Sequence, residues 1–219
     1  MTTRRVFIAG STGATGRTVV RLAERAGVEI VPHQRPKRTA EGNVDPRAVV
    51  LDLADAPGLG AAMRKCTTVM QLIGTVRSRF SRGDTYETSD IGTTRQLVDA
   101  AKLAGSIDHI VLLSSVGAGK NRGAYLKAKA IAEEIVRESG IAYTIFRPST
   151  FVGEGHRAPP GFGPITKLFG LSSLRPIDLE DLAAALLRCA ADRAPLATVL
   201  EGDSLWELVA RARTALAGR

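Results

Sequence analysis

The chain has 219 residues, of which 44% are hydrophobic, 24% charged and 5% aromatic. This length and composition are typical of one globular domain and exclude a disordered or fibrous protein. Lys and Arg outnumber Asp and Glu by 30 to 22, a net charge of +8, but the basic residues are scattered without a reader motif, so we expect no specific nucleic-acid partner.

Apolar runs alternate with segments of helical periodicity, which predicts a parallel sheet covered by helices on both faces. We expect strands at 4–9, 28–33, 48–53, 68–74, 109–115 and 142–148, and helices at 17–26, 59–65, 89–104, 125–139, 179–191 and 204–217. Gly27 closes the first helix, Pro148 ends the last strand, and Asp178 caps the helix after it.

Two segments carry no clear periodicity. Residues 34–47 are polar and indicate a loop with at most a short helical turn, and residues 153–164 are rich in Gly and Pro and indicate a rim loop. We therefore expect residues 1–219 to form a single domain, in which about 150–219 make a small C-terminal, substrate-side part.

The sequence also bears on location and redox state. No apolar stretch approaches the roughly 20 residues that cross a bilayer, and the opening MTTRRVFIAG lacks the apolar core of a signal peptide. We expect a cytoplasmic protein without a membrane span. Cys66 and Cys189 stand alone, without a C-x-x-C pair or a nearby His cluster, so we predict reduced, packed thiols and no metal site.

Three glycines, Gly10, Gly13 and Gly16, follow the first strand in the stretch FIAGSTGATGRTVV and open the first helix. Backbone N–H groups and the positive helix end would point at a pyrophosphate there, and the missing side chains would let it approach. A tight turn with close helix packing could use the same glycines. Their place in the first βα turn of an alternating chain favours the dinucleotide site.

The residues after the second strand indicate which dinucleotide. An NAD-selective site carries an acidic residue about 20 positions on, whereas this chain reads HQRPKR, with Arg35 19 residues after Gly16. Arg35, with Lys37 and Arg38 behind it, suits a 2′-phosphate and favours NADP(H), with NAD(H) as the other candidate; a solvated basic loop is the alternative. Asp52 is expected either to accept a hydrogen bond from an adenine amino group or to cap the next turn.

A hydroxyl, a phenol and an ammonium follow from residue 114 onward. Tyr125 and Lys129 are four apart, so they share one helix face, where the ammonium favours the phenolate. Tyr125 would move a proton to or from a carbonyl oxygen, Lys129 would hold the ribose, and Ser114 or Ser115 would donate to the developing oxyanion. An amphipathic helix with an edge tyrosine and a solvated lysine is the alternative. The candidate catalytic residues are Ser115, Tyr125 and Lys129.

The succession of GSTGATG, LSS, YLKAK and FRPSTFVGEG over about residues 4–185 resembles the short-chain dehydrogenase/reductase superfamily, in its extended and atypical branches. LIGT, GTTRQLVDAAKLAG and SGIAYTIFRPS are similar to NAD(P)H-binding, NmrA-like proteins and to bacterial relatives of the dehydrogenase-like accessory subunit of respiratory complex I. The resemblance implies an α/β Rossmann fold, a doubly wound parallel sheet with a small C-terminal α/β extension. It also implies that residues 147–152 lie near the nicotinamide. The expected cofactor-binding residues are Gly10, Thr12, Gly13, Ala14, Thr15, Gly16, Arg35, Asp52, Leu53, Ile73, Gly74, Ser114, Tyr125, Lys129, Pro148, Ser149 and Phe151.

Two functions follow as hypotheses. The first is an NADP(H)-dependent oxidoreductase acting on a small carbonyl, alcohol or quinone-like compound. The second is a non-catalytic NADP(H)-binding redox sensor or assembly protein, with a protein partner or as a homodimer. It is motivated by the interval of ten residues from Ser115 to Tyr125 and by the small part of about 70 residues after FRPS, which also disfavours a nucleotide-sugar epimerase.

Other conspicuous residues have simpler interpretations. Arg77, Arg79 and Arg82 are expected in a solvated basic loop, with an acidic ligand as the alternative. His156 titrates near neutrality but has no spacing that ties it to Tyr125. Trp206 is expected to be a packing residue of the last helix.

Overall fold

The fold is built on a parallel seven-stranded sheet in the order β3-β2-β1-β4-β5-β6-β9. The computed structural model describes residues 4–36, 44–74, 85–120, 123–153 and 172–217. The strands are β1 (Arg5–Ala9), β2 (Glu29–Gln34), β3 (Val49–Val50), β4 (Thr68–Gln71), β5 (His109–Leu113), β6 (Ala142–Phe146) and β9 (Thr198–Leu200). A separate parallel pair joins β7 (Phe151–Val152) to β8 (Ile177–Asp178).

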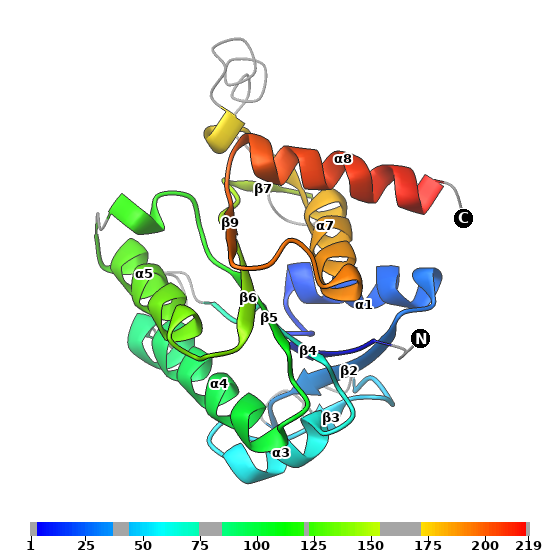
Figure 1. Ribbon diagram of the computed structural model, residues 1–219, viewed down its shortest axis with the longest axis vertical. Coiled ribbons are helices and arrows are strands. Elements are labelled where there is room, and N and C mark those ends of the chain that lie inside the picture. The colour runs from blue at the N-terminus through cyan, green and yellow to red at the C-terminus, as the bar shows by residue number, and fades with distance from the viewer. Residues whose placement is uncertain (1–3, 37–43, 75–84, 121–122, 154–171, 218–219) are drawn as a thin grey trace.

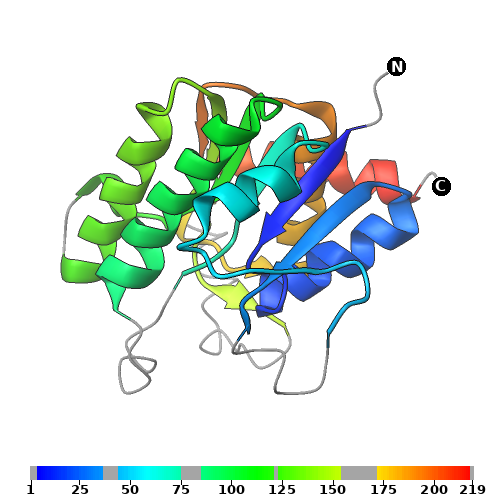
Figure 2. The same ribbon diagram turned by 90° about the horizontal axis from the view of Figure 1, so that it is seen from below.

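Helices cover both faces of the sheet (Figure 1). One face carries α1 (Ala14–Ala26), α7 (Leu179–Asp192) and α8 (Asp203–Ala217), and the other carries α3 (Ala56–Met63), α4 (Thr93–Ala104) and α5 (Gly123–Arg137), as Figure 2 shows from a second side. A π-helical turn, η2 (Glu87–Gly92), leads directly into α4. Two 3₁₀ turns, η3 (Ala118–Lys120) and η4 (Ser172–Leu174), complete the described elements.

The strands divide their side chains between two cores because successive residues of a strand point to opposite faces. Val6 and Ile8 of β1 pack with α1, α7 and α8, whereas Phe7 and Ala9 pack with α3 and α4. The inner strands are buried on both sides, which explains their nearly continuous apolar sequence. This is the doubly wound Rossmann-like fold that the sequence predicts.

The connections reverse direction along the sheet after β3. From β1 the chain runs outward to β2 and β3, then returns to β4 on the other side of β1 and continues to β5, β6 and β9. The loops after β1 and β4 therefore diverge at the carboxyl ends of adjacent strands, which is where open α/β sheets bind their ligands.

The described elements follow the predicted order, but the bounds of most of them shift by one to three residues. The first helix begins at Ala14, before the predicted Arg17, and the third strand keeps only Val49–Val50 of 48–53. The predicted helix 89–104 is a π-helical turn followed by an α-helix. Short strands β7, β8 and β9 were not predicted, since two or three residues carry too little alternation to show in a sequence.

Predicted ends of elements are confirmed. Gly27 closes α1 in the left-handed conformation with φ +65°, and the Asp178 carboxylate caps α7 by accepting from the Glu180 N–H at 2.8 Å. Trp206 packs against the core formed with α1 and α7, as expected, and its Nε1–H donates to the Ser172 carbonyl at 3.2 Å.

Both cysteines are buried and free. Burial raises the pKa of Cys66 to about 11 and that of Cys189 to about 12, so neither thiol is reactive at neutral pH. Among the described residues, no helix is long and apolar enough to cross a membrane, and no three His, Cys, Asp or Glu side chains group as metal ligands.

Candidate dinucleotide site

The loop between β1 and α1 brings three glycines into a tight backbone cluster. Gly10 has φ +92°, which favours glycine, and its carbonyl accepts the Gly13 N–H at 3.0 Å. A Cβ on Gly16 would lie only 2.1 Å from that carbonyl oxygen, so the first turn of α1 is packed against the loop backbone.

The N-terminus of α1 has no side-chain cap. Gly13 is its N-cap and supplies no side-chain capping bond, and the first turn holds no acidic residue. The N–H groups of Ala14, Thr15 and Gly16 have no acceptor within the helix because they belong to its first turn. Together with the positive helix end, they fit a pyrophosphate in the position that the sequence predicts.

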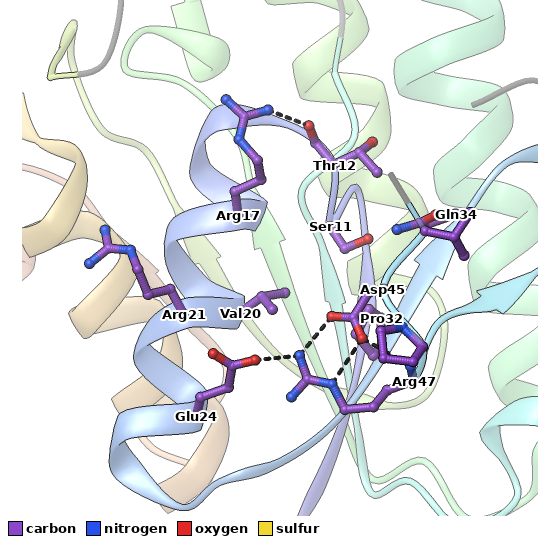
Figure 3. A pocket seen from close by; sticks show the side chains of 12 residues that line it. Ser11, Thr12, Arg17, Val20, Arg21, Glu24, Pro32, Gln34, Asp45 and Arg47 are labelled. Atoms are coloured by element: carbon purple, nitrogen blue, oxygen red, sulfur yellow. Dashed lines mark hydrogen bonds and ion pairs between the residues drawn. The ribbon is translucent and has the colours of Figure 1, made fainter. Parts of the chain in front are cut away.

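A cavity of about 790 Å³ lies beside this loop, between α1 and the end of β2. Figure 3 shows the side chain of Arg17 turned back to the loop, where Nη1 donates to the Thr12 carbonyl at 2.7 Å. Across the cavity Arg47 contacts both Glu24 and Asp45 at 2.6 Å. The hydrogen bonds from Arg47 hold the pKa of the Asp45 carboxyl below its ordinary value.

Arg35 directly follows the last residue of β2 and is half-buried. Its charge contributes, after burial, to the lowered pKa of neighbouring His33. Arg47 is engaged by two carboxylates, and Arg35 stands at the end of β2, the position where the sequence predicts a cation for a cofactor phosphate. Lys37 and Arg38 lie outside the described residues, as do Arg77, Arg79, Arg82 and His156.

Asp52 follows β3 and caps the next turn, one of the two roles that the sequence predicts for it. Its Oδ1 accepts the Ala54 N–H at 2.9 Å, while Leu53 is buried in the core formed with α3 and α4. Asp52 is itself exposed. A single carboxylate can accept more than one donor, so this turn is compatible with a contact to adenine.

The segment after β4 lies between the glycine loop and Lys129. A Cβ on Gly10 would lie 2.9 Å from the Leu72 carbonyl carbon and 3.2 Å from the side chain of Ile73. Two residues after Leu72, a Cβ on Gly74 would lie 3.0 Å from Lys129 Nζ. Ile73 and Gly74 thus lie between the loop and Lys129, and their binding of a cofactor stays a prediction.

Lys129 is buried and held by two acceptors. Its Nζ lies 2.8 Å from Asp90 Oδ1, in the π-helical turn, and donates to the Leu113 carbonyl at 3.2 Å. Tyr125 is half-buried one helical turn earlier, and its ring centroid lies 5.9 Å from Lys129 Nζ and 5.5 Å from the ring centroid of Tyr86. The predicted pair therefore shares one face of α5, and the lysine is not solvated.

The two serines after β5 have different surroundings. Ser114 is buried and donates to Glu133 Oε1 at 2.6 Å, so its hydroxyl serves an internal ion network. Ser115 is half-buried and its carbonyl accepts the Ala118 N–H at 3.2 Å, in the turn that leads toward Tyr125. Ser115 is the better candidate for contact with a substrate oxygen.

The stretch after β6 borders the same edge. The Pro148 carbonyl accepts the Val116 N–H at 2.9 Å, which ties it to the turn after Ser115. Ser149 instead donates to the Leu174 carbonyl at 2.9 Å, and Phe151 packs against the α7 core as part of β7. Within this stretch, Pro148 is therefore the residue that bonds directly to the turn after Ser115.

Three residues of this region were not singled out from the sequence: Gln34, Asp90 and Glu133. Gln34 is buried, lines the cavity, and its Oε1 has no hydrogen-bond partner in the described part of the chain. Asp90 and Glu133 had a detectable signal, since each places an acid on the face of a helix that apolar neighbours bury. This pattern does not predict which residue pairs with each acid, because helical spacing relates only residues of the same helix.

Comparison with known proteins agrees with this geometry. The model of the NAD(P)H-binding family matches residues 10–193. The chloroplastic divinyl chlorophyllide a 8-vinyl-reductase of rice is 31% identical over 85% of this chain and 51% of its own length. Subunit 9 of the NADH dehydrogenase [ubiquinone] 1 alpha subcomplex of Arabidopsis thaliana, a mitochondrial protein, is 28% identical over 84% of this chain and 49% of its own.

The fold recurs in solved structures. The oxidoreductase YlbE of Lactococcus lactis superposes with a TM-score of 0.69 at 18% identity, covering 94% of this chain and 95% of the other. The chain spans about half the length of the first two curated relatives.

The family match over residues 10–193 agrees with the glycine loop and the sheet order of this chain. Together they show that the chain belongs to the NAD(P)H-binding family of the atypical short-chain dehydrogenase/reductase type.

Proposed function

We propose that the protein is an NADP(H)-dependent oxidoreductase acting on a small carbonyl, alcohol or quinone-like compound. The observation that carries the proposal is that Tyr125 and Lys129 share one face of α5, with Lys129 buried beside the segment after β4 that packs on the glycine loop. The rice relative is named a reductase, which supports this class of chemistry.

The chain's own groups would handle the proton. NADPH, when bound, supplies a hydride to the carbonyl carbon. Tyr125 donates its phenolic proton to the carbonyl oxygen, with a hydrogen bond from Ser115 to that oxygen, and the phenolate is reprotonated from solvent. The ammonium of Lys129, which contacts Asp90 and donates to the Leu113 carbonyl, would hold the ribose with its remaining N–H. Residues from about 150 to 219 would form the substrate-side wall, within a single domain.

Replacing Tyr125 by Phe tests the proton transfer. The ring and its packing stay, but the transferable proton is lost, so we expect the rate of NADPH oxidation with the best substrate of a carbonyl and quinone panel to fall about 100-fold or more. The affinity for NADPH should change little. Tyr143→Phe, on β6 with its ring packed in the α3 core, is the matched control. Unchanged turnover in Tyr125→Phe would sink the proposed role.

The preference for NADP(H) is proposed from Arg35. A charge-assisted contact with the 2′-phosphate is worth about one to two powers of ten in affinity. We therefore expect Arg35→Ala to weaken NADPH binding about tenfold or more and to leave NADH binding unchanged, as measured by titration. Arg25→Ala, an exposed arginine of α1, is the control. Equal affinity of the wild-type protein for NADPH and NADH would refute the preference.

A non-catalytic NADP(H)-binding protein is the second candidate. It is favoured by the engagement of two predicted active-site groups in internal bonds, Ser114 with Glu133 and Lys129 with Asp90. The Arabidopsis relative is named a subunit of a larger complex, which supports a role with a protein partner or as a homodimer. NADPH binding without turnover on the whole panel, equal in wild type and Tyr125→Phe, would favour this candidate. Either function is proposed for a cytoplasmic protein.

A further inference from the structure

The ammonium of Lys129 has a buried anionic partner. Lys129 and Asp90 are 7% and 1% exposed at their side chains, and their charged atoms lie 2.8 Å apart. The charges of such a pair largely cancel for a third group a few ångströms away. Removing the carboxylate would leave a buried ammonium whose field is poorly screened by water.

This pair lies beside the segment that follows β4. A Cβ on Gly74 would meet both members, Lys129 Nζ at 3.0 Å and Asp90 Oδ1 at 3.2 Å. Gly74 follows the same short segment that packs on Gly10 through Leu72 and Ile73. A dinucleotide whose pyrophosphate lies on α1 extends along this edge, so its nicotinamide half would lie on the side of the pair.

The two oxidation states of the cofactor differ in charge at that end. The oxidised nicotinamide ring carries one positive charge, and the reduced ring is neutral. An unpaired ammonium would repel the oxidised ring by Coulomb interaction and leave the reduced ring almost unaffected. A carboxylate that cancels the ammonium removes this discrimination.

We propose that Asp90 sets the redox-state preference of the site: by neutralising Lys129 it lets the oxidised cofactor bind alongside the reduced one. This inference rests on the proposed function, since it places the nicotinamide beside Lys129. It assigns Asp90 a specificity role that goes beyond cofactor binding or proton transfer. A site that admits both states suits reversible hydride transfer.

The test is the ratio of dissociation constants, oxidised over reduced, measured with NADP⁺ and NADPH on the full chain at pH 8. We expect Asp90→Asn to raise this ratio about five- to tenfold, a change of about 1 kcal/mol or slightly more. Loosening of α5 or of the π-helical turn would weaken both forms together and leave the ratio unchanged. Glu87→Gln makes the same charge change at an exposed site on the same π-helical turn and should keep the wild-type ratio.

Two further variants test the direction in which the ratio of dissociation constants changes. Lys129→Gln should lower the ratio, since it leaves the carboxylate, and Asp90→Asn combined with Lys129→Gln should return it toward the wild-type value. These two carry the test if Asp90→Asn alone does not fold. If the wild-type protein binds both NADP⁺ and NADPH, and every variant keeps its ratio of dissociation constants, the role of Asp90 is overturned and the proposed function is not. A wild-type protein that binds neither form overturns the proposed function and this inference with it.

Discussion

The conformation of the glycine loop depends on the absence of a Cβ atom at Gly16. A Cβ on Gly16 would lie 2.1 Å from the Gly10 carbonyl oxygen and 2.7 Å from the Ser11 Cα, both backbone atoms that cannot rotate away. A Cβ on Gly13 would lie 3.3 Å from the same oxygen, a contact that a small shift relieves. The three glycines of the motif are therefore not equivalent.

Gly16→Ala should displace the loop and lose its cradle of N–H groups. We expect a loss of stability of about 1–3 kcal/mol, the usual cost of forcing atoms into a packed site, and loss of NADPH binding. Gly13→Ala is the matched control and should lose less of both. Thermal unfolding and NADPH titration of the two variants measure the difference, and an equal effect of both would contradict this account of the loop.

At the same scale, spacing along the chain predicts candidate site residues but not the partners of those residues. Gly10, Gly16, Tyr125 and Lys129 carry a recognisable spacing, and their role in a cofactor site stays a prediction. The contact between Lys129 and Asp90 joins residues 39 positions apart on different elements. No local pattern encodes such a contact, because it exists only once the elements are packed.

At the scale of elements, α5 owes its position to a buried acid. Burial alone would raise the pKa of Glu133, but hydrogen bonds from Arg147, Ser114 and Arg137 hold it below its ordinary value. Arg147 follows β6 and donates to Glu133 at 2.8 and 2.6 Å, and it also contacts Glu201, after β9, at 3.3 Å. This network ties the helix of Tyr125 and Lys129 to the ends of three strands.

Elements with a strong period were predictable, and those without were not. The amphipathic pattern of 179–191 and the apolar run of 109–113 appear where they were expected. The π-helical turn was missed because a widened turn over Glu87–Gly92 leaves too short a trace in a helical period. The early start of α1 was missed because Ala14–Gly16 holds no large apolar residue to mark a buried face.

At the scale of the whole molecule, alternation along the chain predicts the parallel sheet because crossover helices must cover both of its faces. The extra strand β9 is a different case, since it pairs with β6 through a connection that contains α7. That the chain forms one domain remains a prediction.

The sheet interior couples the stability of the whole fold to pH. His109 of β5 is fully buried, and its Nε2 lies 2.9 Å from Thr144 Oγ1 on β6. Thr144 donates its own proton to the Pro195 carbonyl, so Nε2–H must be the donor between the two side chains. In the described part of the chain Nδ1 has no hydrogen-bond partner, which fits a neutral ring.

Burial, followed by the charge of Arg193, lowers the pKa of His109 to about 4 in the folded protein, whereas an unfolded chain has a value of about 6.5. Between these values the unfolded state binds a proton that the folded state refuses. The free energy of unfolding therefore falls as the pH drops from about 6.5 toward 4, by up to about 1.4 kcal/mol per pH unit. Burial lowers the pKa of His33 as well, which acts in the same direction.

His109→Gln removes this titration and keeps a side chain that can donate to Thr144. Urea unfolding of wild type and variant at pH 7 and pH 5 isolates the effect, because the other groups titrate in both proteins. We expect the variant to be less stable at pH 7 and to lose about 1–2 kcal/mol less than the wild type on going to pH 5. Parallel losses in the two proteins would mean that the native state accepts the proton on His109 at pH 5.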